Sequence, residues 1–177
     1  MDKSMSMNGD TKWVPGQPYR QAKGELGQII ALRLPPGADV YTTLKEVARQ
    51  EKIASGLILS GLGSLRQITL RNVRLFPEEF PIQDRHRIYA PRAEPMELLA
   101  LSGNISQRDG EVHVHAHAMI SSGLEEGAVY GGHLLEGCVV FSTVEIVICA
   151  IHGMNMIREM DPQTRVVELY FLPPEPR

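Results

Sequence analysis

Hydrophobic and polar residues alternate along much of this chain with the two-residue period of a β-strand. The clearest case is residues 111–120, EVHVHAHAMI, in which small apolar residues occupy every second position. Other segments are apolar and rich in β-branched residues, and they end at glycine, proline or charged residues, which also predicts strands. We expect these further strands at residues 28–34, 57–60, 65–73, 96–105, 138–151 and 166–171.

One segment has the period of a helix instead. An apolar stripe at helical spacing begins at Val40, and Asp39 precedes it as a candidate N-cap. We predict a principal helix that ends near Gln50, and a second, short helix over residues 154–160. Because strands predominate and several links between them are short, the pattern favours an α+β fold with a mainly antiparallel sheet.

The connecting segments contain the residues that turns require. Gly61 and Gly63 predict a tight turn between two strands, and residues 108–110, Arg-Asp-Gly, predict another. Residues 77–94 are rich in proline and charge, which indicates a long loop at a sheet edge or at a partner contact. We expect a further loop over residues 121–132.

The 177 residues fit one domain. Residues 1–22 are polar, with two prolines, and we interpret them as a flexible N-terminal tail. Residues 173–177 form a similar C-terminal tail. The single folded unit is therefore expected over residues 23–172.

Net charge limits the classes of partner. The formal charge of −3 gives no bulk basic excess of the kind that nucleic-acid-binding domains carry. The chain contains neither an apolar run long enough to cross a membrane nor an N-terminal signal segment. We therefore expect a cytoplasmic protein without membrane contact.

Histidines form the main chemical pattern. His113, His115 and His117 fall on one face of the predicted strand, because successive side chains of a strand point to opposite faces. The intervening Val and Ala residues suit a core on the other face. Imidazoles two residues apart on a strand are close enough to converge on one ion. His133 could add a third nitrogen if the preceding loop folds back.

Three histidines with an open position are typical of an accessible zinc site, and imidazole also suits iron, nickel and copper. The alternative is a polar strand face or a subunit interface without an ion. His86 and His152 have the sequence context of ordinary histidines. The Gly131-Gly132 pair before His133 either forms a plain turn or allows close approach of the backbone.

One carboxylate and two cysteines are further candidates for chemistry. Glu145 lies in an apolar strand, where a carboxylate needs a partner. It could orient a ligand histidine, act as a general base or pair with an arginine. Cys138 and Cys149 lie in apolar segments and are interpreted as buried reduced thiols, with a disulfide or a metal ligand as alternatives. No phosphate-binding loop, nucleophile elbow or HExxH motif occurs.

Several segments occur in an order that resembles a known family. GLILSGLGSLRQITL, PMELLALSGNIS, HAHAMIS and GGHLLEGCVVFSTVEIVI are similar to the plant- and prokaryote-conserved (PPC) domain. The resemblance covers most of the chain, from about Leu26 to Phe171. It implies a mainly antiparallel sheet with flanking helices and a homotrimer. Prokaryotic members are commonly described as candidate DNA-binding proteins, and some carry a three-histidine metal site.

The resemblance also implies ligands. The family's HxH pattern falls on His115 and His117, and the histidine of GGHL is His133, which leaves His113 as an extra, alternate ligand. The implied cofactor is a divalent transition metal, with zinc as the first expectation. The chain lacks the basic AT-hook of the plant proteins. Direct DNA contact would therefore need arginines that cluster, and the candidates are Arg66, Arg71 and Arg74, or Arg85, Arg87 and Arg92.

Three functions follow as hypotheses. The first is a trimeric PPC-type regulator that contacts DNA or another protein. The second is a metal-dependent enzyme that acts on a small molecule, with a metal-bound water and a nearby proton carrier. The third is an assembly role in which the histidines only pack at a subunit interface.

Overall fold

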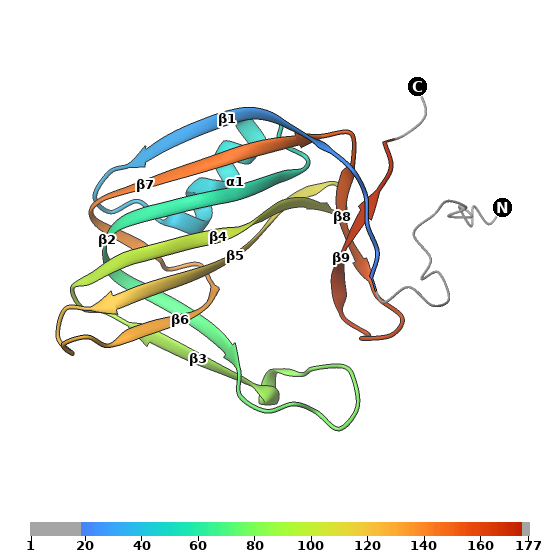
Figure 1. Ribbon diagram of the computed structural model, residues 1–177. Coiled ribbons are helices and arrows are strands. Elements are labelled where there is room, and N and C mark those ends of the chain that lie inside the picture. The colour runs from blue at the N-terminus through green and yellow to red at the C-terminus, as the bar shows by residue number, and fades with distance from the viewer. Residues whose placement is uncertain (1–18, 175–177) are drawn as a thin grey trace.

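The computed structural model describes residues 19–174 and shows one nine-stranded sheet with one α-helix. Figure 1 shows a strongly curved sheet, with α1 behind strands β1, β7 and β2 in this view. The helical elements are α1 (Val40–Gln50) and a 3₁₀ turn (Asp84–His86). The strands are β1 (Glu25–Leu34), β2 (Gly56–Val73), β3 (Arg87–Arg92), β4 (Met96–Arg108), β5 (Glu111–Ser122), β6 (Val129–Leu134), β7 (Val139–His152), β8 (Asn155–Met160) and β9 (Val167–Leu172).

The strand order is β1-β7-β2-β6-β5-β4-β8-β9, and β2 also pairs with β3 and β4. Every pairing is antiparallel except that of β4 with β8. β7 lies between β1 and β2 and is therefore an interior strand. The β8–β9 hairpin stands across one end of the sheet (Figure 1). The expected α+β class, with a mainly antiparallel sheet and one principal helix, is confirmed.

The helix α1 forms as its sequence predicts. The Asp39 side chain accepts a hydrogen bond from the Thr42 backbone N–H at 2.8 Å, which satisfies one of the unpaired donors of the first turn. Val40, Leu44 and Ala48 are fully buried, so the apolar stripe faces the core. The other Asp39 oxygen accepts from the Gly137 N–H at 2.8 Å and ties the helix start to the segment before β7.

Two short segments differ from the prediction. Gly61 and Gly63 lie inside the continuous strand β2 and not in a turn. A side chain at Gly61 would come within 2.7 Å of Leu101, and Gly63 has a φ of +145° beside the backbone of β7, so both glycines permit close approach of neighbouring strands. The predicted short helix at 154–160 was also wrong. It is strand β8, because residues 155–160 pair along their length with β9.

The remaining boundaries follow the expectations with two additions. The turn at Asp109-Gly110 has positive φ at both residues and closes the β4–β5 hairpin as predicted. The expected long loop at 77–94 instead contains β3, which pairs with β2 at the edge of the sheet. The predicted tails at 1–22 and 173–177 lie largely outside the described residues. Within residues 19–174, no helix has the length and apolar content needed to cross a membrane.

Candidate metal centre and its cavity

Strand β5 separates its core face from its histidine face as the alternation predicts. Val112, Val114, Ala116 and Ala118 are buried in the main core. His113 and His115, on the opposite face, are half-buried, and His117 is exposed. The apolar face fixes the register of β5, since a slip by one residue would bury the imidazoles. The core therefore determines where the histidines point.

Strand β6 brings His133 to the same place. His133 is the direct cross-strand partner of His117 on β5 and of Arg71 on β2. The predicted loop through Gly132 was too long, because β6 already begins at Val129. Gly131 and Gly132 are therefore strand residues, and neither has positive φ. A side chain at Gly132 would lie 2.5 Å from the Asn72 Oδ1, so this glycine permits close packing and does not form a turn.

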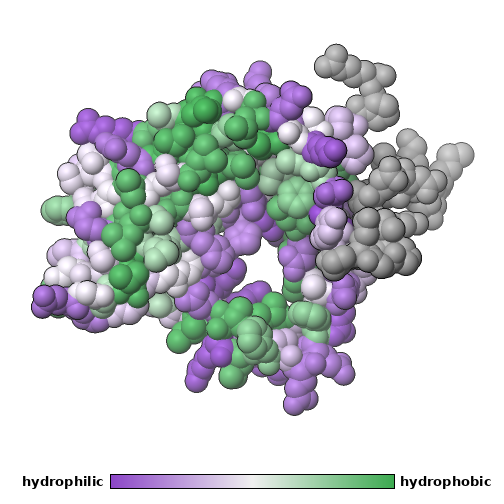
Figure 2. Space-filling view, viewed as in Figure 1, coloured by the Kyte–Doolittle hydropathy of each residue, from purple (hydrophilic) through white to green (hydrophobic). Residues whose placement is uncertain are grey.

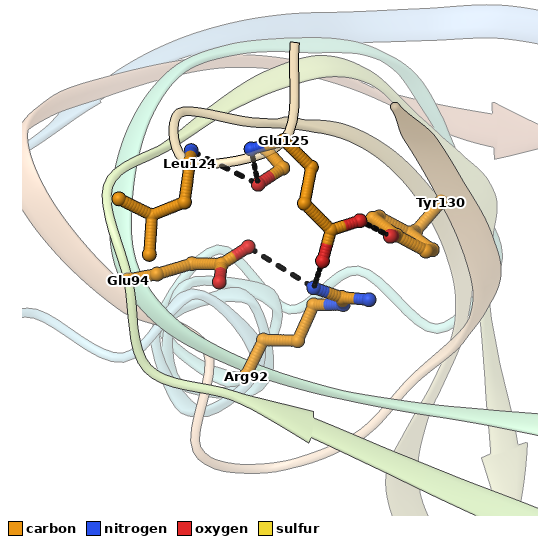
Figure 3. A network of polar contacts seen from close by, with 6 residues as sticks. Arg92, Glu94, Leu124, Glu125 and Tyr130 are labelled. Carbon is orange, nitrogen blue, oxygen red and sulfur yellow. Dashed lines mark hydrogen bonds and ion pairs between the residues drawn. The ribbon is translucent and has the colours of Figure 1, made fainter. Parts of the chain in front are cut away.

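Polar contacts hold the β5–β6 connection in place (Figure 3). The Arg92 guanidinium contacts the carboxylates of Glu94 at 3.1 Å and Glu125 at 3.7 Å. It also lies 3.5 Å from the centre of the Tyr130 ring, and the Tyr130 hydroxyl donates to Glu125. The Ser122 Oγ accepts the backbone N–H groups of residues 124 and 125. This network links β3 to the loop that precedes His133.

The three histidines assigned from the sequence converge. His115, His117 and His133 can each offer one nitrogen, and these atoms lie within 4.8 Å of one another. The Nε2 atoms of His115 and His117 are 3.2 Å apart, and the His115 and His133 ring centres are 4.8 Å apart. Ligand nitrogens of one zinc ion lie about 2.0–2.1 Å from the metal.

Burial and positive charge keep the imidazoles of His115 and His133 neutral. Burial lowers the pKa of His115 to about 4, assisted by the Arg158 charge. The pKa of His133 is lowered to about 3 by burial and by Arg71. Only a neutral imidazole has the free electron pair that a metal requires. In number and spacing, the residues present fit a three-histidine site that leaves a coordination position for water or a ligand.

Arg158, on β8, completes the surroundings of His115. Its Nη2 donates to the His115 Nδ1 at 2.9 Å, and a guanidinium has no acceptor, so this nitrogen of His115 carries no proton. The same side chain donates to Ser106 and to Asn104 on β4, both at 3.1 Å. The position of Arg158 depends on the parallel pairing of β4 with β8. The ring of His115 is thus held from the side opposite His117.

The other sequence candidates lie elsewhere. His113 lines the same cavity but is not part of the converging group, and its Nδ1 is buried without a partner among the described residues. His86 accepts a backbone hydrogen bond from Gln83, which confirms an ordinary structural histidine. Glu145 is exposed on β7 between Arg33 and Leu62, in a different hollow from the histidines. It therefore neither orients a ligand histidine nor serves this site as a base.

The cysteines are confirmed as free and buried thiols, at Cys138 and Cys149. Burial raises the pKa of Cys138 to about 12, so its thiol stays protonated. Neither cysteine belongs to the group that could hold a metal. Both therefore act as small apolar core residues.

The sequence did not reveal the cavity beside the histidines. It has a volume of about 730 Å³, and His113, His115 and His133 lie on its wall together with Arg71, Arg87, Arg108 and Arg158. Figure 2 shows the molecule hollowed at this position, between the β8–β9 hairpin and the rest of the sheet. The sequence offered Arg71 and Arg87 only as part of a surface patch, and Arg158 fell in a predicted helix. No local signal indicated that β8 would cross the histidine face.

Comparison with solved structures places this architecture among known proteins. A plant- and prokaryote-conserved (PPC) protein of Pyrococcus horikoshii is 29% identical, with a TM-score of 0.68 over 90% of this chain and 99% of that chain. A metal-containing protein of Archaeoglobus fulgidus is 26% identical, with a TM-score of 0.70 over 85% and 99%. A Ralstonia eutropha protein, provisionally named as DNA-binding, has a TM-score of 0.62 at 24% identity, over 78% of this chain and 88% of that chain, which shows the fold alone.

Curated relatives extend the comparison. Two proteins from Synechococcus strains, each named bifunctional protein GlmU, are 34% and 35% identical over 92% and 90% of this chain. The chain spans only about a quarter of their length, 24% and 22%. The sequence profile of the Plants and Prokaryotes Conserved (PCC) domain matches residues 21–152, which include the three converging histidines. The chain therefore belongs to the Plants and Prokaryotes Conserved domain family.

Proposed function

We propose that this chain is a metal-binding protein in which His115, His117 and His133 hold one divalent transition metal, with zinc as the first candidate. The observation that carries the proposal is the convergence of three imidazoles from two adjacent strands. The pKa values of His115 and His133 are lowered, which keeps these two rings neutral. The metal content implied by the name of the Archaeoglobus structure supports it. The ion would keep at least one coordination position open, which suits Lewis-acid chemistry or activation of a bound water.

Metal titration tests this proposal. The purified chain is stripped with a chelator, dialysed and titrated with Zn²⁺, Fe²⁺, Ni²⁺ and Cu²⁺ in a calorimeter. We expect one ion per chain, and a loss of binding in His115→Ala, His117→Ala and His133→Ala. The matched control is His113→Ala, since His113 lies on the same strand face but outside the converging group. Equal binding by the control and by the three ligand variants would refute the assignment.

The cavity beside the histidines favours a small-molecule ligand for this site. Its volume lies within the range of ordinary small-ligand pockets, about 300–1,000 Å³. Direct DNA contact is the second candidate, which the name of the Ralstonia protein supports. The net charge of −3 and the ion pairs of Arg92 argue against a broad basic surface. A gel-shift titration at low salt decides, because phosphate contacts would give a steep loss of binding as salt rises.

Self-association, expected as a homotrimer, is part of the proposal. Large apolar side chains remain exposed on β2, β4, β5 and β7, and Figure 2 shows apolar residues gathered on the face in view. Leu62 is 56% exposed and Phe141 65% exposed, which is unusual for a monomer surface. We expect a trimer by light scattering, and dissociation in the double variant Leu62→Glu, Phe141→Glu. A monomeric parent chain would refute it.

A further inference from the structure

The cavity next to the histidines has an excess of positive charge. Its wall contains four arginines, Arg71, Arg87, Arg108 and Arg158, against two glutamates, Glu136 and Glu168. Among the described residues, only Arg108 of the four has an ion pair, with Asp109 at 3.6 Å. The neighbouring imidazoles carry no negative charge in either protonation state and cannot compensate the cations. The cavity therefore attracts anions of a size that it can enclose.

Arg158 is the buried cation among these four arginines. Only 8% of the residue is exposed, and its hydrogen-bond partners Ser106, Asn104 and His115 are all uncharged. Within residues 19–174, no carboxylate lies within ion-pair distance of its guanidinium, and Glu168 acts on it only from farther away. A buried charge without a counter-charge is costly in free energy, and proteins usually pair it.

One nitrogen of this guanidinium is available. Nε and Nη2 make the three hydrogen bonds, whereas Nη1 donates to none of the described residues. Nη1 is not among the buried polar atoms that lack a hydrogen-bond partner, which means that it is accessible to solvent. Because Arg158 lines the cavity, we take Nη1 to be accessible from there. Its two N–H groups can donate to an oxyanion, which is the strongest kind of hydrogen bond that a guanidinium makes.

The proposed metal increases this demand for an anion. Three neutral imidazoles leave the full charge of a divalent ion uncompensated, directly beside Arg158 and Arg71. If the ion binds the Nε2 of His115, the ring's proton moves to Nδ1, and Arg158 loses its acceptor there. A ligand oxyanion would replace that acceptor and offset both charges.

We propose that the cavity binds a small organic oxyanion, through a carboxylate or phosphate group held by Arg158 and Arg71 next to the three histidines. This deepens the proposed function and rests on it for the metal contact only. The arginine contact does not need the ion, so the metal-free chain also binds the anion, more weakly. The shared chemistry is a compact group with several oxygens, which both acid types provide.

The test measures anion binding by thermal shift and calorimetry on the full chain at constant ionic strength. The probes are inorganic phosphate, succinate and chloride, each with and without Zn²⁺. We expect saturable stabilisation by phosphate or succinate and none by chloride. The stronger of the two identifies the acid type. Equal stabilisation by chloride would overturn the proposal, and so would stabilisation by a short DNA duplex but by neither small anion.

Variants locate the site. Arg158→Gln and Arg71→Gln should each weaken anion binding at least about tenfold, as expected for loss of a charged hydrogen-bond donor. Arg71 is only half-buried, so its variant keeps the proposal testable if Arg158→Gln fails to fold. Arg66→Gln is the matched control on the same strand, outside the cavity. Unchanged affinity in Arg71→Gln relative to Arg66→Gln would refute the assignment.

The measurements with and without Zn²⁺ distinguish a failure of this inference from a failure of the proposed function. By thermodynamic linkage, an anion that contacts the ion must tighten Zn²⁺ binding by the same factor by which Zn²⁺ tightens anion binding. Anion binding without any metal binding would contradict the proposed function and leave the arginine site standing. Metal binding without any anion effect would support the proposed function and overturn this inference.

Discussion

Gly103→Ala should distort the candidate metal centre through the β5 backbone, without changing any histidine. Gly103 on β4 pairs with Ala116 on β5, between the candidate ligands His115 and His117. An added Cβ would lie 2.2 Å from the His115 carbonyl oxygen and 2.7 Å from the Ala116 Cα. Both are backbone atoms, so neither can rotate away. β5 itself must therefore move.

The size of the effect follows from this geometry. Ordinary contact begins near 3.4 Å, so the carbonyl oxygen must move by about an ångström. Overpacking of this kind costs about 1–3 kcal/mol in the free energy of unfolding. For a domain of this size, that corresponds to a fall in Tm of roughly 2–12 °C. Metal distances tolerate only about 0.2 Å of error, so we expect metal affinity to fall at least about tenfold.

The assay pairs thermal unfolding with zinc titration. Gly110→Ala is the control, because Gly110 has a φ of +79° in an open turn and its substitution strains the backbone away from the site. The control should lose about 1 kcal/mol of stability but bind zinc as the parent does. If Gly103→Ala keeps the parent's Tm and zinc affinity, the close β4–β5 packing described here is wrong.

Three further predictions test other parts of the structure. The pKa values of His115 and His133, about 4 and about 3, lie below the ordinary 6.5, so the unfolded chain takes up protons first. Urea unfolding should therefore show full stability above pH 6.5 and a progressive loss towards pH 4, and a flat profile would contradict the neutral histidines. Asp39→Ala should lower the free energy of unfolding by about 1–2 kcal/mol in denaturant titrations, since it removes the cap of α1; Asp39→Asn should recover only part of it, because one amide oxygen replaces the two oxygens that accept from Thr42 and Gly137. Arg92→Leu should speed proteolytic cleavage within residues 123–128, measured by mass spectrometry, and unchanged cleavage would argue against the Arg92 network.

Short-range patterns were sufficient to predict most elements. The alternation in β5 predicted both the buried face at Val114 and the exposed face at His117, because each residue's face depends only on the strand period. The stripe beginning at Val40 predicted α1 for the same reason. The wrong predictions concern segments whose structure depends on pairing with strands distant in the sequence. Gly61 permits a turn or a close strand crossing, and only the position of Leu101 selects the latter.

In the candidate site, too, local patterns predicted some residues and tertiary pairing determined the others. The alternation placed His113, His115 and His117 on one face, and the resemblance to the PPC family selected His115 and His117 together with His133. The β5–β6 register explains why these three meet. Arg158 could not be placed, because its position depends on a parallel pairing with a strand far away in sequence. Glu145 was considered for the site because a carboxylate in an apolar strand needs a partner. In the structure Glu145 lies on the exposed face of β7, where its carboxylate is accessible to solvent.

X-ray absorption spectroscopy of the zinc-loaded chain tests the central claim most directly, since it reports the atoms around the ion. The structure predicts three imidazole nitrogens at about 2.0–2.1 Å, together with at least one light-atom ligand from water or an anion. In His133→Ala the imidazole count should fall by one. A spectrum with fewer than three imidazoles in the parent, or with sulfur ligands, would contradict a metal centre built from β5 and β6.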